Sequence, residues 1–194
     1  ILGSCQNAQK EKKQDVPKPN IIIILADDMG YGDLSCYGQK KLSTPHIDNL
    51  AKSGIKFTQH YAGSTVCAPS RSSLMTGLHT GHTFIRGNKA WEPEGQYPLE
   101  ADAITLAEIL KEAGYITGVF GKWGLGFIGT EGEPANQGFD EFFGYNCQGL
   151  AHNYYPYYLW HNNKKVVLEE NEGTKTGQYA PEIIHEYAIK FLES

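Results

Sequence analysis

The stretch Asn20-Ile-Ile-Ile-Ile-Leu-Ala26 is a short β-branched apolar run, and it stops abruptly at Asp27 and Asp28. A central strand of a parallel sheet has this character, because both of its faces are buried. We therefore expect a strand here, with the two acids at its carboxyl end. Adjacent carboxylates repel each other unless a cation lies between them, so both are candidate ligands of a hard divalent metal, calcium or magnesium. The alternative is a solvated turn or a helix cap.

Helices and strands are expected to alternate along the rest of the chain. Caps, prolines and apolar spacing predict helices over 46–53, 69–78, 105–114 and 180–192, strands over 55–61 and 115–120, and a hairpin within 154–168. This alternation predicts an α/β fold with a largely parallel sheet flanked by helices. Ligand sites in such folds lie beyond the carboxyl ends of the strands, where Asp27, Asp28 and Lys122 fall.

The composition is that of a globular protein. The chain has 194 residues, of which 40% are hydrophobic and 20% charged, which argues against disorder and against a coiled coil. No run approaches the ~20 apolar residues that a membrane-spanning helix needs. The net charge of −5 does not suggest a nucleic-acid-binding surface.

The first residues, Ile1-Leu-Gly-Ser-Cys5, resemble a bacterial lipobox, in which a leucine and two small residues precede a cysteine that is lipidated. The resemblance implies a signal remnant and lipobox over 1–5, with lipidation at Cys5, a flexible tether over 6–19, and the folded domain over 20–194. It also implies an exported protein of the bacterial cell envelope, in the periplasm or at the surface, anchored by lipid alone. The alternative is a chance match at a ragged start.

Two further cysteines, Cys36 and Cys147, have neither zinc-site nor redox spacing. A disulfide between them is one possibility in an oxidising compartment, and two buried free thiols are the other.

Cys67 opens the segment Cys67-Ala-Pro-Ser-Arg71, and Pro69 is placed to start a helix directly after it. The cysteine side chain is therefore expected to face free backbone N–H groups at a positive helix end, which favours anions. Arg71, one turn along, adds a guanidinium suited to oxyanions or to a carboxylate. These features predict a thiolate nucleophile, and a buried structural cysteine is the alternative.

Three segments resemble signatures of the type I, formylglycine-dependent sulfatases, which belong to the alkaline-phosphatase-like superfamily. Cys67–Gly77 resembles the first signature, Cys-x-Pro-Ser-Arg followed by apolar residues and glycine. Gly114–Gly126 resembles the second signature, and Ala26–Asp33 resembles the family's metal-binding start. The three occur in the family's order, so the resemblance covers 20–194 and implies the α/β fold of that superfamily.

The resemblance implies a role for each matched residue. Asp27 and Asp28 would bind calcium together with the modified Cys67, Arg71 would steady the nucleophile, and Lys122 would contact the sulfate. A partner enzyme, oxygen-dependent or radical, would convert the cysteine to formylglycine. One hydroxyl of the hydrated aldehyde would attack sulfur, and the other would expel sulfate by re-forming the aldehyde. Calcium and the lysine would offset charge on the sulfuryl oxygens.

The chain departs from the family at Gly124, where many members have a histidine two residues after the lysine. That histidine helps to bind or orient the formylglycine hydroxyl, so its absence puts one contact in doubt. His152 is the candidate substitute, as a substrate-binding residue, and an ordinary surface or core histidine is the alternative.

In the resemblance, the family's remaining metal ligands and a further lysine and histidine lie beyond residue 194. The isolated chain is therefore expected to be inactive, with an incomplete sheet and marginal stability.

The predicted activity is that of a sulfuric ester hydrolase of the arylsulfatase type. A sulfated carbohydrate is the expected substrate, because an envelope enzyme meets extracellular glycans. The aromatic residues of 154–160 could pack on sugar rings or on one another. The alternative enzyme is a phosphonate monoester or phosphodiester hydrolase of the same superfamily. The alternative of another class is a non-catalytic envelope protein that binds sulfated glycans.

Overall fold

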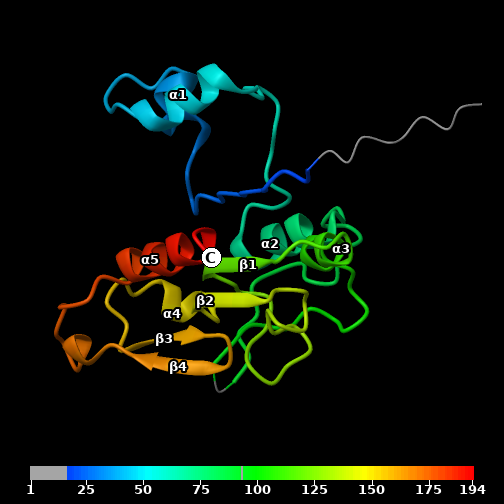
Figure 1. Ribbon diagram of the computed structural model, residues 1–194, viewed down its shortest axis with the longest axis vertical. Helices are drawn as coiled ribbons and strands as arrows, with labels where there is room; N and C mark the ends of the chain where they lie inside the picture. Colours follow the sequence, from blue (N-terminus) through cyan, green and yellow to red (C-terminus); the bar gives the residue numbers. More distant parts are fainter. Residues whose placement is uncertain (1–16, 93) are drawn as a thin grey trace, which may run out of the picture. The chain divides into compact units, whose positions relative to one another are not determined.

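The computed structural model describes residues 17–92 and 94–194 (Figure 1). The chain divides into two compact units, Ile1–Lys56 and Phe57–Ser194, and each is described by itself. The predicted lipobox with Cys5 and most of the predicted tether lie outside the described residues.

The described part of the first unit is built from short helices. They are η1 (Tyr31–Asp33) and η2 (Ser35–Tyr37), both 3₁₀-helices, and α1 (Pro45–Ser53). The prediction of α1 from its flanking residues is confirmed. The carboxylate of Asp48 in α1 accepts hydrogen bonds from the Cys36 amide at 2.8 Å and from the Thr44 hydroxyl at 3.0 Å, so α1 and the preceding loop hold each other in place.

The strands predicted over 21–26 and 55–61 are not formed. Neither segment belongs to a strand, and the side chains from Ile21 to Leu25 are between 47% and 85% exposed. A strand needs a neighbour to pair with, and an apolar run by itself cannot supply one. Both predictions are therefore wrong for the described structure.

The second unit contains a four-stranded sheet in the order β1-β2-β3-β4. The strands are β1 (Gly118–Lys122), β2 (Glu141–Tyr145), β3 (Tyr158–His161) and β4 (Lys164–Val167). β1 and β2 are parallel and the other two pairs are antiparallel, so the α/β fold is confirmed with a mixed sheet. The predicted hairpin is β3–β4, and Asn162 in its turn has the positive φ, 51°, that tight hairpin turns favour.

Helices accompany this sheet. They are α2 (Cys67–Thr76), α3 (Leu106–Glu112), α4 (Gln148–Ala151), η3 (Glu169–Asn171) and α5 (Ala180–Leu192). The capping box predicted for α3 is formed, because the Thr105 hydroxyl accepts from the Glu108 amide and the Glu108 carboxylate accepts from the Thr105 amide. α5 has the predicted bounds. Among the described residues, no helix is both long and apolar enough to cross a bilayer.

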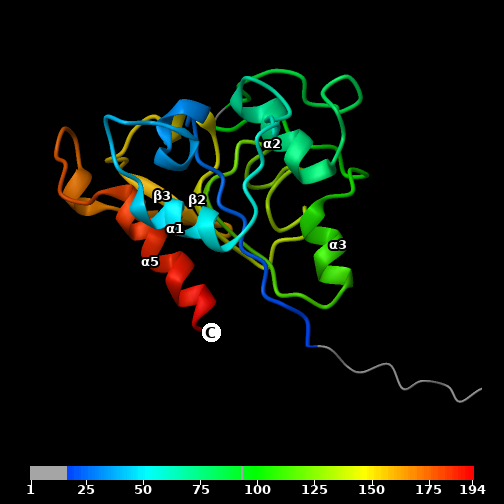
Figure 2. The same cartoon turned by 90° about the horizontal axis from the view of Figure 1, so that it is seen from above.

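The sheet buries a different apolar cluster on each face. Neighbouring residues of a strand point to opposite faces, and Phe142 and Phe143 of β2 accordingly belong to different clusters. Phe142 packs in the cluster that includes Ala68 of α2, whereas Phe143 stacks on Tyr187 of α5 with ring centroids 3.6 Å apart. α2 therefore covers one face of the sheet and α5 the other, as Figure 2 shows from above.

Candidate active site

Cys67 is the first residue of α2, which begins two residues before Pro69. This corrects the expectation that the helix starts after the cysteine. Pro69 has no N–H, and the amide of Ala68 donates to the Asn88 side chain at 2.9 Å. The cysteine thus lies in the first turn, but fewer N–H groups of that turn are available to an anion than the sequence suggests.

Three predicted site residues meet at the end of β1. Lys122 is the last residue of that strand, and its ammonium group donates to Cys67 Sγ at 3.5 Å. Arg71, one turn into α2, donates from its guanidinium to the backbone carbonyl of Lys122 at 2.5 Å. All three side chains are partly buried. A sulfur beside an ammonium group, with a guanidinium bound to the backbone of the same lysine, forms a site suited to an oxyanion.

The spacing of these groups is fixed by the core beside them. Ala68 follows Cys67, Trp123 follows Lys122, and both belong to the same buried cluster. The indole N–H of Trp123 also donates to the carbonyl of Gly132 at 2.7 Å. Because the cluster is closely packed, α2 and the end of β1 cannot shift independently without opening these contacts.

The loop after β1 runs beside the loop after β2. The amides of Trp123 and Gly124 donate to the carbonyls of Tyr145 and Asn146, which extends the parallel pairing beyond the strands. Gly124 is buried with φ 76°, and a Cβ there would lie 2.2 Å from Nε2 of Gln148, the first residue of α4. Sequence reasoning missed this glutamine, because a single glutamine after a strand forms no recognisable pattern.

His152, the predicted substitute for the missing histidine, is exposed and caps the end of α4. Its role in substrate binding stays a prediction.

Asp27 and Asp28 lie in an exposed turn of the first unit, and Asp28 has φ 54°. Carboxylates have the oxygen chemistry that calcium prefers, so the pair fits part of a calcium ligand set. Calcium takes ~6–8 oxygen ligands. Within 17–92 and 94–194, no group of three or more His, Cys, Asp and Glu residues could hold a metal. The calcium-binding role of this pair stays a prediction.

Cys36 and Cys147 are free thiols, and because Cys36 is only partly buried, the expectation of a buried thiol holds for Cys147 alone. Cys147 is buried, and burial raises the pKa of its thiol. This thiol therefore stays protonated at neutral pH and is structural.

The aromatic residues after α4 pack mainly on protein groups. Tyr158 and Trp160 both donate to the carboxylate of Glu94, and Tyr155 packs against Tyr179 with ring centroids 5.5 Å apart. Burial and the neighbouring Glu94 carboxylate raise the pKa of Tyr158. The sequence left open whether these rings pack on sugar rings or on one another. Tyr155, Tyr158 and Trp160 make contacts within the protein.

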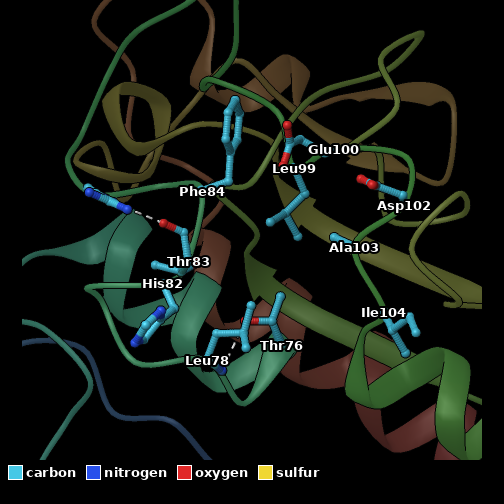
Figure 3. A pocket seen from close by; sticks show the side chains of 11 residues that line it. Thr76, Leu78, His82, Thr83, Phe84, Leu99, Glu100, Asp102, Ala103 and Ile104 are labelled. Atoms are coloured by element: carbon cyan, nitrogen blue, oxygen red, sulfur yellow. Dashed lines mark hydrogen bonds between the residues drawn. The ribbon is translucent and has the colours of Figure 1, made fainter.

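A separate pocket of about 600 Å³ lies between the end of α2 and the segment that leads into α3 (Figure 3). His82, Leu99 and Asp102 are among the residues that line it. Neither Cys67 nor Lys122 lines this pocket, so it is not the candidate active site.

Comparison with known proteins agrees with the three sequence signatures. Residues 19–194 match the family described as Sulfatase. The chain is 47% identical over 133 residues to an N-acetylgalactosamine-6-O-sulfatase of Bacteroides thetaiotaomicron, which covers 68% of this chain and 25% of that protein. It is 46% identical over 129 residues to arylsulfatase A of Homo sapiens, covering 65% of this chain and 25% of that protein. The chain thus spans about a quarter of the length of these curated relatives.

Solved structures share the fold. "Crystal structure of Ps i-CgsB" matches with a TM-score of 0.74 and 33% identity, covering 91% of this chain and 42% of that chain. "Structure of BT4656 in complex with its substrate D-Glucosamine-2-N, 6-O-disulfate" matches with a TM-score of 0.72 and 32% identity, covering 92% of this chain and 32% of that chain. With the family match extending over nearly all of its residues, the chain belongs to the sulfatase family.

Proposed function

We propose that the protein hydrolyses sulfate esters of carbohydrates, R–O–SO₃⁻ + H₂O → R–OH + HSO₄⁻. The observation that carries this proposal is the contact between Lys122 Nζ and Cys67 Sγ. It joins a cation to the side chain that the sulfatase family converts into its nucleophile. A sulfuryl group attacked at that position would lie within reach of the ammonium group.

In this proposal Cys67 is converted to formylglycine, whose hydrated aldehyde supplies the hydroxyl that attacks sulfur. Lys122 binds the sulfuryl oxygens and offsets the charge that develops on them. Arg71 holds the backbone of Lys122 through the carbonyl contact and adds positive charge. It is therefore a positioning residue.

Calcium is the proposed metal, with Asp27 and Asp28 as two of its ligands. The support is the hard oxygen chemistry of two adjacent, exposed carboxylates. Bound calcium would act as a Lewis acid on a sulfuryl oxygen.

The proposed substrate class is a sulfated sugar. One relative is named as an N-acetylgalactosamine-6-O-sulfatase, and one of the similar solved structures is a complex of its protein with a disulfated glucosamine as substrate. Other relatives are named arylsulfatases, which supports the use of simple aryl sulfates in assays.

Two further proposals concern maturation and location. An oxygen-dependent or radical enzyme modifies Cys67, and a lipid on Cys5 anchors the protein to the bacterial envelope. The Cys67–Arg71 segment supports the first, and the lipobox-like start supports the second.

The test is sulfate release by the full-length protein purified from its native host. N-acetylgalactosamine 6-sulfate and p-nitrophenyl sulfate are supplied with calcium and after chelation, beside bis(p-nitrophenyl) phosphate. We expect calcium-dependent sulfate release that Cys67→Ala abolishes. Faster turnover of the phosphodiester would favour the phosphorus-ester alternative. Sulfated-sugar binding without turnover would favour the non-catalytic protein.

A further inference from the structure

Gln148 is a buried amide whose polar atoms lack protein partners. The residue is 5% exposed, and among the described residues neither its Oε1 nor its Nε2 has a hydrogen-bond partner. A primary amide has two N–H donors and an acceptor oxygen, and burial without partners is unfavourable for all of them. Buried polar groups in native proteins are nearly always paired, so an unpaired amide points to something that binds it.

Gln148 lies near the carboxyl ends of β1 and β2, where the candidate site is found. It lies in the segment that follows β2, whose last residue, Tyr145, pairs with Lys122 in the parallel ladder. The two segments stay together beyond the ladder, because the amide of Gly124 donates to the carbonyl of Asn146 at 3.0 Å. Asn146 is 1% exposed, and its Oδ1 also lacks a hydrogen-bond partner among the described residues. The segment after β2 therefore contains two buried amide side chains, Asn146 and Gln148, with polar atoms that lack a hydrogen-bond partner among the described residues.

Gly124 is what makes room for the Gln148 side chain. A Cβ at Gly124 would lie 2.2 Å from Nε2 of Gln148, closer than non-bonded atoms can approach. Any larger side chain two residues after Lys122 would therefore compete with the glutamine for the same space. The two positions are coupled, and a glutamine from the β2 segment occupies the space that Gly124 leaves empty.

We propose that Gln148 binds the sulfate group of the substrate, donating from Nε2 to a sulfuryl oxygen beside Lys122. This inference rests on the proposed function, since it requires a sulfate ester at the Cys67–Lys122 contact. An amide does not titrate at physiological pH, so Gln148 supplies a directional hydrogen bond and transfers no proton. Lys122 then supplies a positive charge that attracts the sulfate, and Gln148 supplies a hydrogen bond that orients it. Exposed His152, at the other end of α4, is the less suitable partner for a buried group.

The test uses the full-length, calcium-loaded protein with two substitutions at this position. Gln148→Met keeps the length of the side chain and removes the hydrogen bond, and Gln148→Glu places a negative charge against the sulfate. The matched control is Gln137→Met. Gln137 is a buried glutamine whose Nε2 donates to the carbonyl of Glu131 at 3.0 Å, so that, unlike Gln148, only its Oε1 lacks a hydrogen-bond partner among the described residues. No hydrogen bond between described residues joins it to Cys67 or Gln148. Measurements are kcat, KM, the inhibition constant of inorganic sulfate, and Tm.

For Gln148→Met we expect kcat/KM to fall by roughly 10- to 100-fold, as for one hydrogen bond to a charged group, with weaker inhibition by sulfate. Its Tm should equal or exceed that of the wild type, because an unsatisfied amide is removed. Gln148→Glu should lose more activity. Gln137→Met should show the opposite pattern, a lower Tm with kcat/KM retained.

Two results would overturn the inference. The first is a kcat/KM of Gln148→Met within twofold of the wild type. The second is a fall in the Tm of Gln148→Met equal to that of Gln137→Met, which would show that Gln148 has a structural role. A wild-type protein that binds inorganic sulfate but hydrolyses no sulfate ester overturns the proposed function instead. For such a protein, the inference is tested by the rise in Tm that inorganic sulfate causes in the wild type. The inference predicts that this rise disappears in Gln148→Glu. An unchanged rise would overturn the inference on its own.

Discussion

The ammonium nitrogen of Lys122 lies 3.5 Å from the sulfur of Cys67, although 55 positions separate the two residues in the sequence. One residue ends β1 and the other begins α2, so the contact depends on how α2 packs on the sheet. The guanidinium of Arg71 donates to the backbone carbonyl of Lys122 and ties the two elements together a second time. Packed elements thus hold a cation beside the side chain that we propose as the precursor of the nucleophile, which is how a preorganised charge site is built.

Lys122→Met should lower kcat/KM of the full-length protein by about 100-fold or more, because a preorganised positive charge beside the sulfuryl oxygens is lost. Lys122→Arg should recover part of that loss, since it restores charge but not position. Steady-state kinetics with p-nitrophenyl sulfate measures both. Equal activity of Lys122→Met and the wild type would remove the lysine from the mechanism.

Cys67→Ser should stop after one turnover. A serine can attack sulfur but lacks the second hydroxyl that expels sulfate, so the enzyme should accumulate as a sulfate ester about 80 Da heavier than the free protein. Intact mass spectrometry after incubation with substrate detects this species. Cys67→Ala is the control and should gain no mass. Repeated turnover by the serine variant would show that a simple hydroxyl suffices.

Gly124→Ala should destabilise the protein by more than a strained positive φ alone, because the added Cβ also forces the buried end of the Gln148 side chain to move. Gly129→Ala is the matched control, since Gly129 has φ 85° but open space around its Cβ position. Gly129→Ala should lower the free energy of unfolding only by the cost of a positive φ at alanine, about 1–2 kcal/mol. The difference in urea unfolding free energy isolates the clash. Combining Gly124→Ala with Gln148→Ala should recover that difference, and no recovery would mean that the two positions are not coupled.

Asp140 should lend stability that disappears in acid. Its carboxylate pairs with Lys111 at 2.6 Å and accepts from the amide and hydroxyl of Thr117, and these partners, Lys111 foremost, lower the pKa of the carboxyl group. A lowered folded-state pKa means that the contribution is present above the ordinary pKa of aspartate and is lost as the pH falls through the folded-state value.

Asp140→Asn should therefore cost about 1 kcal/mol at pH 7, since the ion pair is partly exposed, and progressively less below pH ~4. Urea unfolding of both proteins from pH 7 to pH 3 measures the difference. A difference that does not change with pH would assign the effect to packing and not to charge.

Local signals in the sequence predicted local structure well. The capping box at Thr105, the turn at Asn162 and the spacing within Ala180–Leu192 each predict an element that the structure contains, because each is decided by residues within a few positions of one another. Strand partners are decided by distant segments. The run Ile21–Leu25 is therefore apolar without being a strand, and the sheet is mixed where mainly parallel pairing was expected.

The candidate site was predictable in part. Cys67, Arg71 and Lys122 lie in sequence signatures, and the structure brings them together. Gln148 lies in no sequence signature. Its side chain fits where it does because Gly124, on another segment, has no side chain. Only the folded arrangement shows that these two positions share one space.

The modification of Cys67 is the central claim, and peptide mass spectrometry of the full-length protein from its native host tests it most directly. We expect the peptide that contains Cys67 to be lighter than the unmodified peptide by about 18 Da and to react with a carbonyl reagent, as a formylglycine does. An unmodified thiol at Cys67 in the mature protein would contradict the catalytic proposal and would favour a protein that only binds sulfated glycans.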